Sequence, residues 1–199
     1  MRRWGVLLSA VLGTILAVLG LECARPARSS GGWATLSLSE MSVSQRTQWE
    51  RAVAARDALF HRLMNRLQEA IEANGVASAI VVCQAETPRL ARAVSEERGV
   101  AIGRTSRKLR NPNNRPPAWA ETLVDSSRAD ETVLAHTDGR LGVLLPIRLK
   151  SRCLVCHGPT DAIPRDVREM LKAHYPQDAA TGFAEGDLRG WFWVEVPPG

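Results

Sequence analysis

The sequence predicts a mixed α+β domain, in which a long N-terminal helix precedes a small antiparallel sheet with flanking helices. Three observations support this fold class. Apolar side chains recur at helical spacing over residues 42–74, apolar segments flank an Asp138-Gly139 turn, and residues 191–196 alternate as in a strand. Helical and strand-like segments are mixed along a chain that has no internal repeat, as is typical of α+β architecture.

The first predicted element is the amphipathic helix at residues 42–74. Its apolar stripe consists of Trp49, Val53, Phe60, Leu63, Leu67 and Ile71. Asn74-Gly75 is a suitable C-terminal stop, because glycine readily adopts the conformation that ends many helices. At 1.5 Å per residue, a helix of about 30 residues reaches about 45 Å. Such a helix either packs on the domain or holds the domain away from a membrane anchor.

The segments between residues 76 and 124 are shorter. Residues 76–84 are apolar and are compatible with a strand or a helix. Residues 88–97 predict a helix, with Pro88 in its first turn and Gly99 after its end. The segments that follow predict the start of a strand at 100–102, a polar loop at 104–117 and a short helix at 118–124.

A hairpin is predicted over residues 132–150, where two apolar segments flank Thr137-Asp138-Gly139-Arg140. Asp-Gly between apolar runs is a strong hairpin signal. Pro146 predicts that the second strand lies at an edge or bends, since proline has no N–H to donate. A helix at 164–174 and a strand at 191–196 in the same sheet complete the predicted fold.

Composition and charge limit the classes of function. A chain of 199 residues is long enough for one domain with a core, and 45% hydrophobic and 24% charged residues are ordinary for a globular protein. The net charge of +5 comes without a long basic run or an aromatic-rich basic face. We therefore expect no nucleic-acid partner.

The first residues predict a targeting segment. Met1-Arg2-Arg3 is a short basic region, and an apolar run follows at residues 5–21. We predict a signal peptide or membrane anchor at residues 1–24 and a Ser- and Gly-rich linker at 25–41. The rest of the chain is then periplasmic or otherwise exported, and it is anchored to the inner membrane if residues 5–21 are retained. Glu22 disfavours lipidation of Cys23.

The chemistry is concentrated in Cys153-x-x-Cys156-His157. Two thiols at this spacing each add to one vinyl group of haem, and the adjacent histidine ligates the iron. A zinc site needs two more ligands, and the other histidines are scattered singly. A thioredoxin-like dithiol belongs in a βαβ unit, which the pattern does not contain. The single motif predicts one covalently attached haem c per chain, with His157 as the proximal ligand.

The distal ligand of the iron is open from the residues alone. The candidates are Cys83, His61, His136, His174, Met64 and Met170. Cys83 stands out because it is an unpaired cysteine in an apolar run of an exported chain, and iron stabilises a thiolate. The alternative is a buried, inert thiol.

The arginine-rich loop has two interpretations. Arg104, Arg107 and Arg110 are candidates for contacts to the haem propionates, because guanidinium groups match carboxylates in two-point geometry. Alternatively, the loop is structural and its arginines bind nearby backbone groups.

Several short motifs occur in a defined order. They are Ala79-Ile80-Val81-Val82-Cys83, Gly103-Arg104-Thr105-Ser106, Arg110-Asn111-Pro112-Asn113-Asn114, Pro146-Ile147, Cys153-x-x-Cys156-His157-Gly158, Tyr175-Pro176-x-Asp178-x-Ala180-Thr181-Gly182 and Gly186-Asp187-Leu188-Arg189-Gly190. In this order, the chain resembles a bacterial and cyanobacterial c-type haem domain of unknown function. Members of that family occur alone or as the sensory part of larger signalling proteins.

The resemblance implies a PAS-like fold for residues 75–199, with the long helix ahead of it. It also implies an unusual iron that is ligated by a histidine and a cysteine. By that resemblance, Cys83 is the distal ligand and His157 is the proximal one.

Three functions compete for such a domain. The first is a redox or small-ligand sensor, in which reduction or a small gas displaces Cys83 and a separate signalling protein receives the signal. The second is periplasmic electron transfer to a redox partner. The third is a haem enzyme such as a peroxidase, which needs an open iron position and is disfavoured if Cys83 fills it.

Overall fold

The computed structural model describes Met1 and residues 31–199. Apart from Met1, the predicted signal peptide or anchor at 1–24, with its apolar run and Cys23, lies outside the described residues. So does the first part of the predicted linker. No helix among the described residues has the length and apolar character needed to cross a bilayer.

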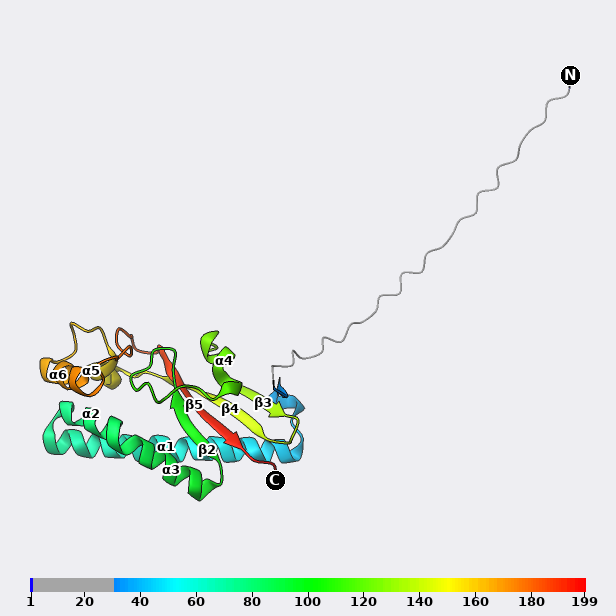
Figure 1. Cartoon of the computed structure of the whole chain (residues 1–199), viewed down its shortest axis with the longest axis horizontal. Helices are drawn as coiled ribbons and strands as arrows, with labels where there is room; N and C mark the ends of the chain where they lie inside the picture. Colours follow the sequence, from blue (N-terminus) through cyan, green and yellow to red (C-terminus); the bar gives the residue numbers. More distant parts are fainter. Residues whose placement is uncertain (2–30) are drawn as a thin grey trace.

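One antiparallel sheet of five strands forms the centre of the molecule, in the order β1-β3-β4-β5-β2 (Figure 1). The strands are β1 (Trp33–Thr35), β2 (Ala101–Thr105), β3 (Thr132–His136), β4 (Leu141–Arg148) and β5 (Leu188–Val196). The predicted hairpin is confirmed, since β3 pairs with β4 around the Asp138-Gly139 turn. The predicted C-terminal strand also lies in this sheet, as β5 between β4 and β2.

The helices flank this sheet, which confirms the predicted α+β class. They are α1 (Val43–Asn74), α2 (Ala79–Val81), α3 (Thr87–Arg98), α4 (Glu121–Asp125), α5 (Leu154–His157) and α6 (Arg165–His174). Four short 3-10 turns are η1 (Leu38–Glu40), η2 (Val76–Ser78), η4 (Ala118–Ala120) and η5 (Ser151–Cys153), and a π-helical turn is η3 (Val82–Glu86).

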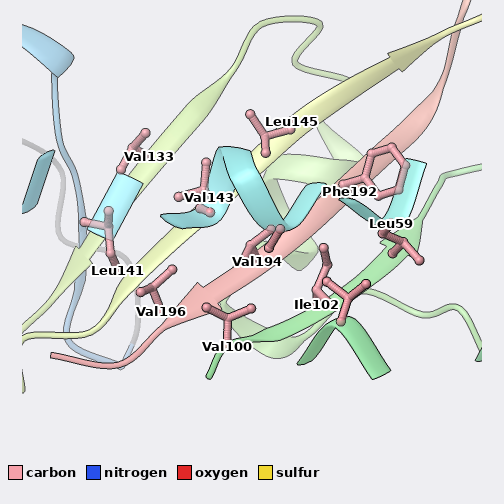
Figure 2. Packing of buried hydrophobic residues seen from close by; sticks show 13 residues of the cluster. Leu59, Val100, Ile102, Val133, Leu141, Val143, Leu145, Phe192, Val194 and Val196 are labelled. Carbon is pink, nitrogen blue, oxygen red and sulfur yellow. The ribbon is translucent and has the colours of Figure 1, made fainter. Parts of the chain in front are cut away.

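The long predicted helix is present as α1. Ser42 and Gln45 form a reciprocal capping box at its start, and Gly75, with φ of +80°, follows its end. Its buried side chains Ala52, Ala55 and Leu59 pack against one face of the sheet. Figure 2 shows Leu59 on α1 close to strand residues of this core. The helix therefore packs on the domain.

Tryptophans cover the other face of the sheet. Trp33, Trp119 and Trp191 pack there with Leu134 and Leu144. Trp33 lies in β1, which pairs with β3, so the part of the predicted linker that the structure describes contains an edge strand.

Residues 76–84, for which the sequence left helix and strand open, are helical. The N–H of Thr87 donates to the carbonyl of Val82, five residues earlier, and Pro88 comes next. Because Pro88 has no N–H and its ring crowds the preceding turn, the wider π-helical turn accommodates it. This turn contains Cys83.

Pro146 does not place β4 at the edge of the sheet, which corrects one of the two expectations for it. β4 lies between β3 and β5. However, the pairing of β3 with β4 ends at Leu144. Pro146 therefore has no partner residue in β3 to which an N–H would have to donate. The pairing with β5 shifts register between Ile147 and Arg148. Proline is tolerated where a strand extends past the end of its neighbour, because no N–H is needed there for pairing.

Candidate functional site

The Cys153-x-x-Cys156-His157 motif forms one short helical segment directly after β4, at the end of the molecule where α5 and α6 lie (Figure 1). The N–H of Cys153 donates to the carbonyl of Lys150, and the N–H of Gly158 donates to that of Leu154. Both thiols are free and partly buried. The helical spacing therefore presents two thiols and an imidazole within a single turn.

The His157 ring is oriented by a backbone carbonyl. Its Nδ1 lies 2.8 Å from the oxygen of Ala180, which can only accept, so Nδ1 carries the proton. Burial and then the positive charges of Arg110 and Arg189 lower the pKa of His157 well below its usual value. The neutral ring keeps a lone pair on Nε2, which is the arrangement of a metal-ligating histidine.

Arg110 connects Asp178 to the backbone around His157. Its Nε lies 3.0 Å from Asp178 Oδ2, and both side chains are about nine-tenths buried. Its Nη2 donates to the carbonyls of Cys156, at 2.6 Å, and Ala180, at 3.2 Å. Asp178 Oδ1 also accepts from the N–H of Ala180. Arg110 is thus engaged with the backbone that carries His157.

Cys83 comes to the same end of the molecule from a distant part of the chain. Ile80, one turn earlier, packs with Tyr175 and with partly buried Cys156. Burial raises the pKa of Cys156 to about 11, and the field of Cys83 contributes to this rise. Burial and the field of Cys83 likewise raise the pKa of Tyr175 to about 12. The fold therefore brings Cys83 into the electrostatic environment of the motif.

The three arginines predicted to contact the propionates have different surroundings in the structure. Arg110 is committed to Asp178 and to carbonyl groups, and Arg107 is exposed and donates to Ser127 Oγ at 2.6 Å. The guanidinium of Arg104 is partly buried and donates no hydrogen bond to a side chain or carbonyl in the described part of the chain.

Arg189, which belongs to the Gly186–Gly190 motif and was not among the predicted site residues, also acts on this site through its charge. Burial and the charges of Arg110 and Arg104 lower the pKa of Arg189 to about 10. Its Nη1 donates to the carbonyl of Lys108 at 3.0 Å. The Gly186–Gly190 motif was the one signal that could have identified it.

The other candidates for a distal ligand have separate environments. His136 Nε2 contacts the carbonyl of Gly31 at 2.8 Å, and His174 Nδ1 contacts Gln84 Oε1 at 2.7 Å. His61 is exposed on α1, which also carries Met64. Met170 is partly buried and packs against the same cluster as Cys156.

A cleft of about 490 Å³ opens beside the π-helical turn. It is lined by Gln84, Pro88, Arg110, Asn111, Pro112, Asn113, Asn114, His174, Tyr175, Pro176 and Gln177. Gln84 directly follows Cys83, and Tyr175 belongs to the cluster around Cys156. The cleft is therefore lined by residues next to Cys83 and Cys156 and not by the two cysteines themselves.

The zinc alternative needs a cluster of ligands. Within residues 31–199, no group of three or more His, Cys, Asp or Glu side chains is arranged to hold a metal ion. The donor set at the motif is instead two thiols, one imidazole and a more distant cysteine.

Comparisons with known proteins give a family and a similar fold. A family model described as "Tll0287-like: Tll0287" matches residues 39–197. The structure described as "Crystal structure of the cyanobacterial heme-protein Tll0287" is similar, with a TM-score of 0.54 and 24% sequence identity. The alignment covers 76% of this chain and 95% of that one. The search of curated proteins found no match.

Proposed function

The chain belongs to the Tll0287-like family, and from that premise we propose that it is a c-type cytochrome domain with one haem attached to Cys153 and Cys156. His157 is the proximal ligand and Cys83 the distal one. The observation that carries the proposal is the orientation of His157, whose Nδ1 donates to Ala180 while Nε2 stays available. This tautomer leaves the Nε2 lone pair free to ligate an iron.

The residues present fit a haem group. Both thiols of the motif are free, as covalent attachment to two vinyl groups requires. The positive charge of Arg104 has no ion-pair partner among the described residues, so an anionic group is suited to this end of the molecule. When bound, haem supplies a one-electron couple and an iron that accepts small ligands.

A redox or small-ligand sensor is the function that we favour. Cys83 lies in a π-helical turn, a geometry that is uncommon and is frequent at functional sites. A helix that contains such a turn has a neighbouring α-helical arrangement available, so binding and release of the Cys83 sulfur give a local element with two states. The cleft beside Gln84 provides an approach for a small molecule.

Periplasmic electron transfer is the second candidate. Cys153 is partly exposed and follows the exposed residues Ser151 and Arg152, so the attachment side of the site lies near the surface. A surface-exposed haem edge is what an electron-transfer partner needs. Export is predicted from the apolar segment at 5–21, which lies outside the described residues. The periplasmic location of the domain therefore stays a prediction.

Covalent attachment is tested by denaturing the purified protein. We expect the haem to stay with the chain after denaturation and acid–acetone extraction, because two thioether bonds hold it. Cys153→Ala or Cys156→Ala should weaken or abolish maturation. Complete extraction of the colour from the wild-type chain would refute the covalent site.

The role of Cys83 is tested by replacing it with alanine. A thiolate favours the ferric state more than neutral methionine sulfur does, so Cys83→Ala should raise the reduction potential and change the ferric optical and electron paramagnetic resonance spectra. Met170→Leu is the matched control and should leave both unchanged. If Cys83→Ala leaves the potential and the spectra unchanged and Met170→Leu changes them, Met170 is the ligand.

Carbon monoxide binding separates the two functions. A sensor should release Cys83 on reduction and bind carbon monoxide in the ferrous state, whereas an electron-transfer protein should keep both ligands. A ferrous wild type that excludes carbon monoxide would remove the basis for gas sensing and favour electron transfer or redox sensing.

A further inference from the structure

Three arginines, Arg110, Arg189 and Arg104, are near enough for their positive charges to act on His157. Arg110 donates to the carbonyl of Cys156, and Arg104 lies on β2. Arg189 lies near the start of β5, which is the strand that pairs with β2. Ser106 Oγ donates to the carbonyl of Arg189 at 2.6 Å, so the end of β2 and the start of β5 are fastened together.

The carboxylates at this position do not balance these charges. Asp178 pairs with Arg110 at 3.0 Å. Neither Arg104 nor Arg189 forms an ion pair with any carboxylate in residues 31–199. The buried Nε of Arg189 has no hydrogen-bond partner there either. Two partly buried cations are therefore left without an anion.

Burying a cation without a counter-ion costs free energy, and the same burial lowers the pKa of its guanidinium group. Burial lowers the pKa of both Arg104 and Arg189. The charge of Arg110 adds to this lowering, whereas the field of Cys83 partly offsets it at both residues. Guanidinium groups that pay desolvation without a counter-ion are expected where a ligand brings the missing negative charge.

We propose that Arg104 and Arg189 bind the two propionate carboxylates of the haem. This inference rests on the proposed function, and it names the part of the ligand that these side chains recognise. Haem carries two carboxylates, and guanidinium groups pair with carboxylates in two-point geometry. Two unpaired cations and two propionates restore neutrality.

The assignment differs from the sequence-based expectation in two residues. Arg110 is a positioning residue, since its hydrogen bonds go to Asp178 and to the backbone of Cys156 and Ala180. Arg107 is exposed and bonded to Ser127. Arg189 takes the place that the sequence suggested for these two.

The test uses the mature holoprotein and its resonance Raman spectrum, in which the propionate bending modes respond to hydrogen bonding. Arg104→Gln and Arg189→Gln should each shift these modes and lower the reduction potential, because loss of a nearby cation destabilises the ferrous state. Arg107→Gln is the matched control and should change neither. Arg104→Lys should restore most of the potential but not the modes, since it keeps the charge without the fork.

Two results would overturn the inference. One is a lowered potential with unchanged propionate modes in both glutamine variants, which would place the arginines beside the Cys83 sulfur. The other is an equal response to Arg107→Gln. If Arg104→Gln does not mature, Arg104→Lys and Arg189→Gln carry the same test. A wild-type chain without covalent haem would instead refute the proposed function, so the two failures are distinguishable.

Discussion

At the scale of single residues, the His157 site depends on a buried ion pair outside the motif. Asp178 accepts from Arg110 with one carboxylate oxygen and from the N–H of Ala180 with the other. The carbonyl of Ala180 then accepts from both Arg110 and His157. One carboxylate therefore supports the orientation of the imidazole.

We predict that Asp178→Asn is strongly destabilising. The amide keeps a carbonyl oxygen for the N–H of Ala180 but removes the charge that balances buried Arg110. Breaking such a pair costs about 3–5 kcal/mol, and denaturant unfolding measures it. Glu169→Gln removes the exposed pair with Arg165 and should cost less than about 1 kcal/mol. Equal effects would mean that the buried pair is unimportant.

At the scale of elements, the π-helical turn η3 is attached on two sides. Glu86 at its end pairs with Arg66 of α1, with Nε and Oε2 2.7 Å apart. Gln84, next to Cys83, bonds His174 of α6 through both its amide nitrogen and its oxygen. η3 is therefore connected directly to the long helix and to the helix beside the motif.

The attachment to α1 predicts a pH dependence. The hydrogen bond from Arg66 lowers the pKa of Glu86 below its usual value of 4.5. The pair therefore stabilises the folded state above that value, and this contribution is lost as the pH falls through the folded-state pKa. At neutral pH, the melting temperature of the wild type should therefore be higher than that of Glu86→Gln.

The difference in melting temperature should disappear in acid. Glu50→Gln is the control, since Glu50 is exposed on α1 and forms no ion pair with any described residue. A difference between wild type and Glu86→Gln that persists below the acid transition would contradict an electrostatic attachment.

At the scale of the whole molecule, α1 connects the sheet to the functional end. Leu59, near its middle, is fully buried with Val194 and Phe192 in the core beneath the sheet. Toward its C-terminus α1 contacts η2 and α2, and Figure 1 shows α2 beside that end of the helix. The core and the site therefore both contact α1.

We predict that Leu59→Ala lowers the free energy of unfolding by about 2–5 kcal/mol, because it leaves a cavity in a closely packed core. Far-ultraviolet circular dichroism and haem absorption should report one shared transition. Val43→Ala, at the exposed start of α1, should change stability by less than about 0.5 kcal/mol. Separate transitions for the two probes would show that the site unfolds independently of the core.

The features that local chemistry specifies could be predicted from the sequence. The helix at 42–74 follows from its apolar stripe, and Ser42 and Gly75 mark its ends within the local chain. The hairpin follows from Asp138-Gly139, and the donor set of the candidate site follows from the spacing of Cys153, Cys156 and His157. In each case the residues that decide the structure lie within a few positions of one another.

Tertiary structure decided the features that depend on distant partners. The helical form of residues 76–84 depends on packing of Ile80 against α6, because a short apolar run has no distinctive period. β4 is internal in spite of Pro146 because its neighbour β3 stops earlier. Likewise, the sequence alone could not separate Arg104 from Arg107 and Arg110. Asp178 and Ser127 satisfy the other two, and both partners come from segments that only folding brings into contact.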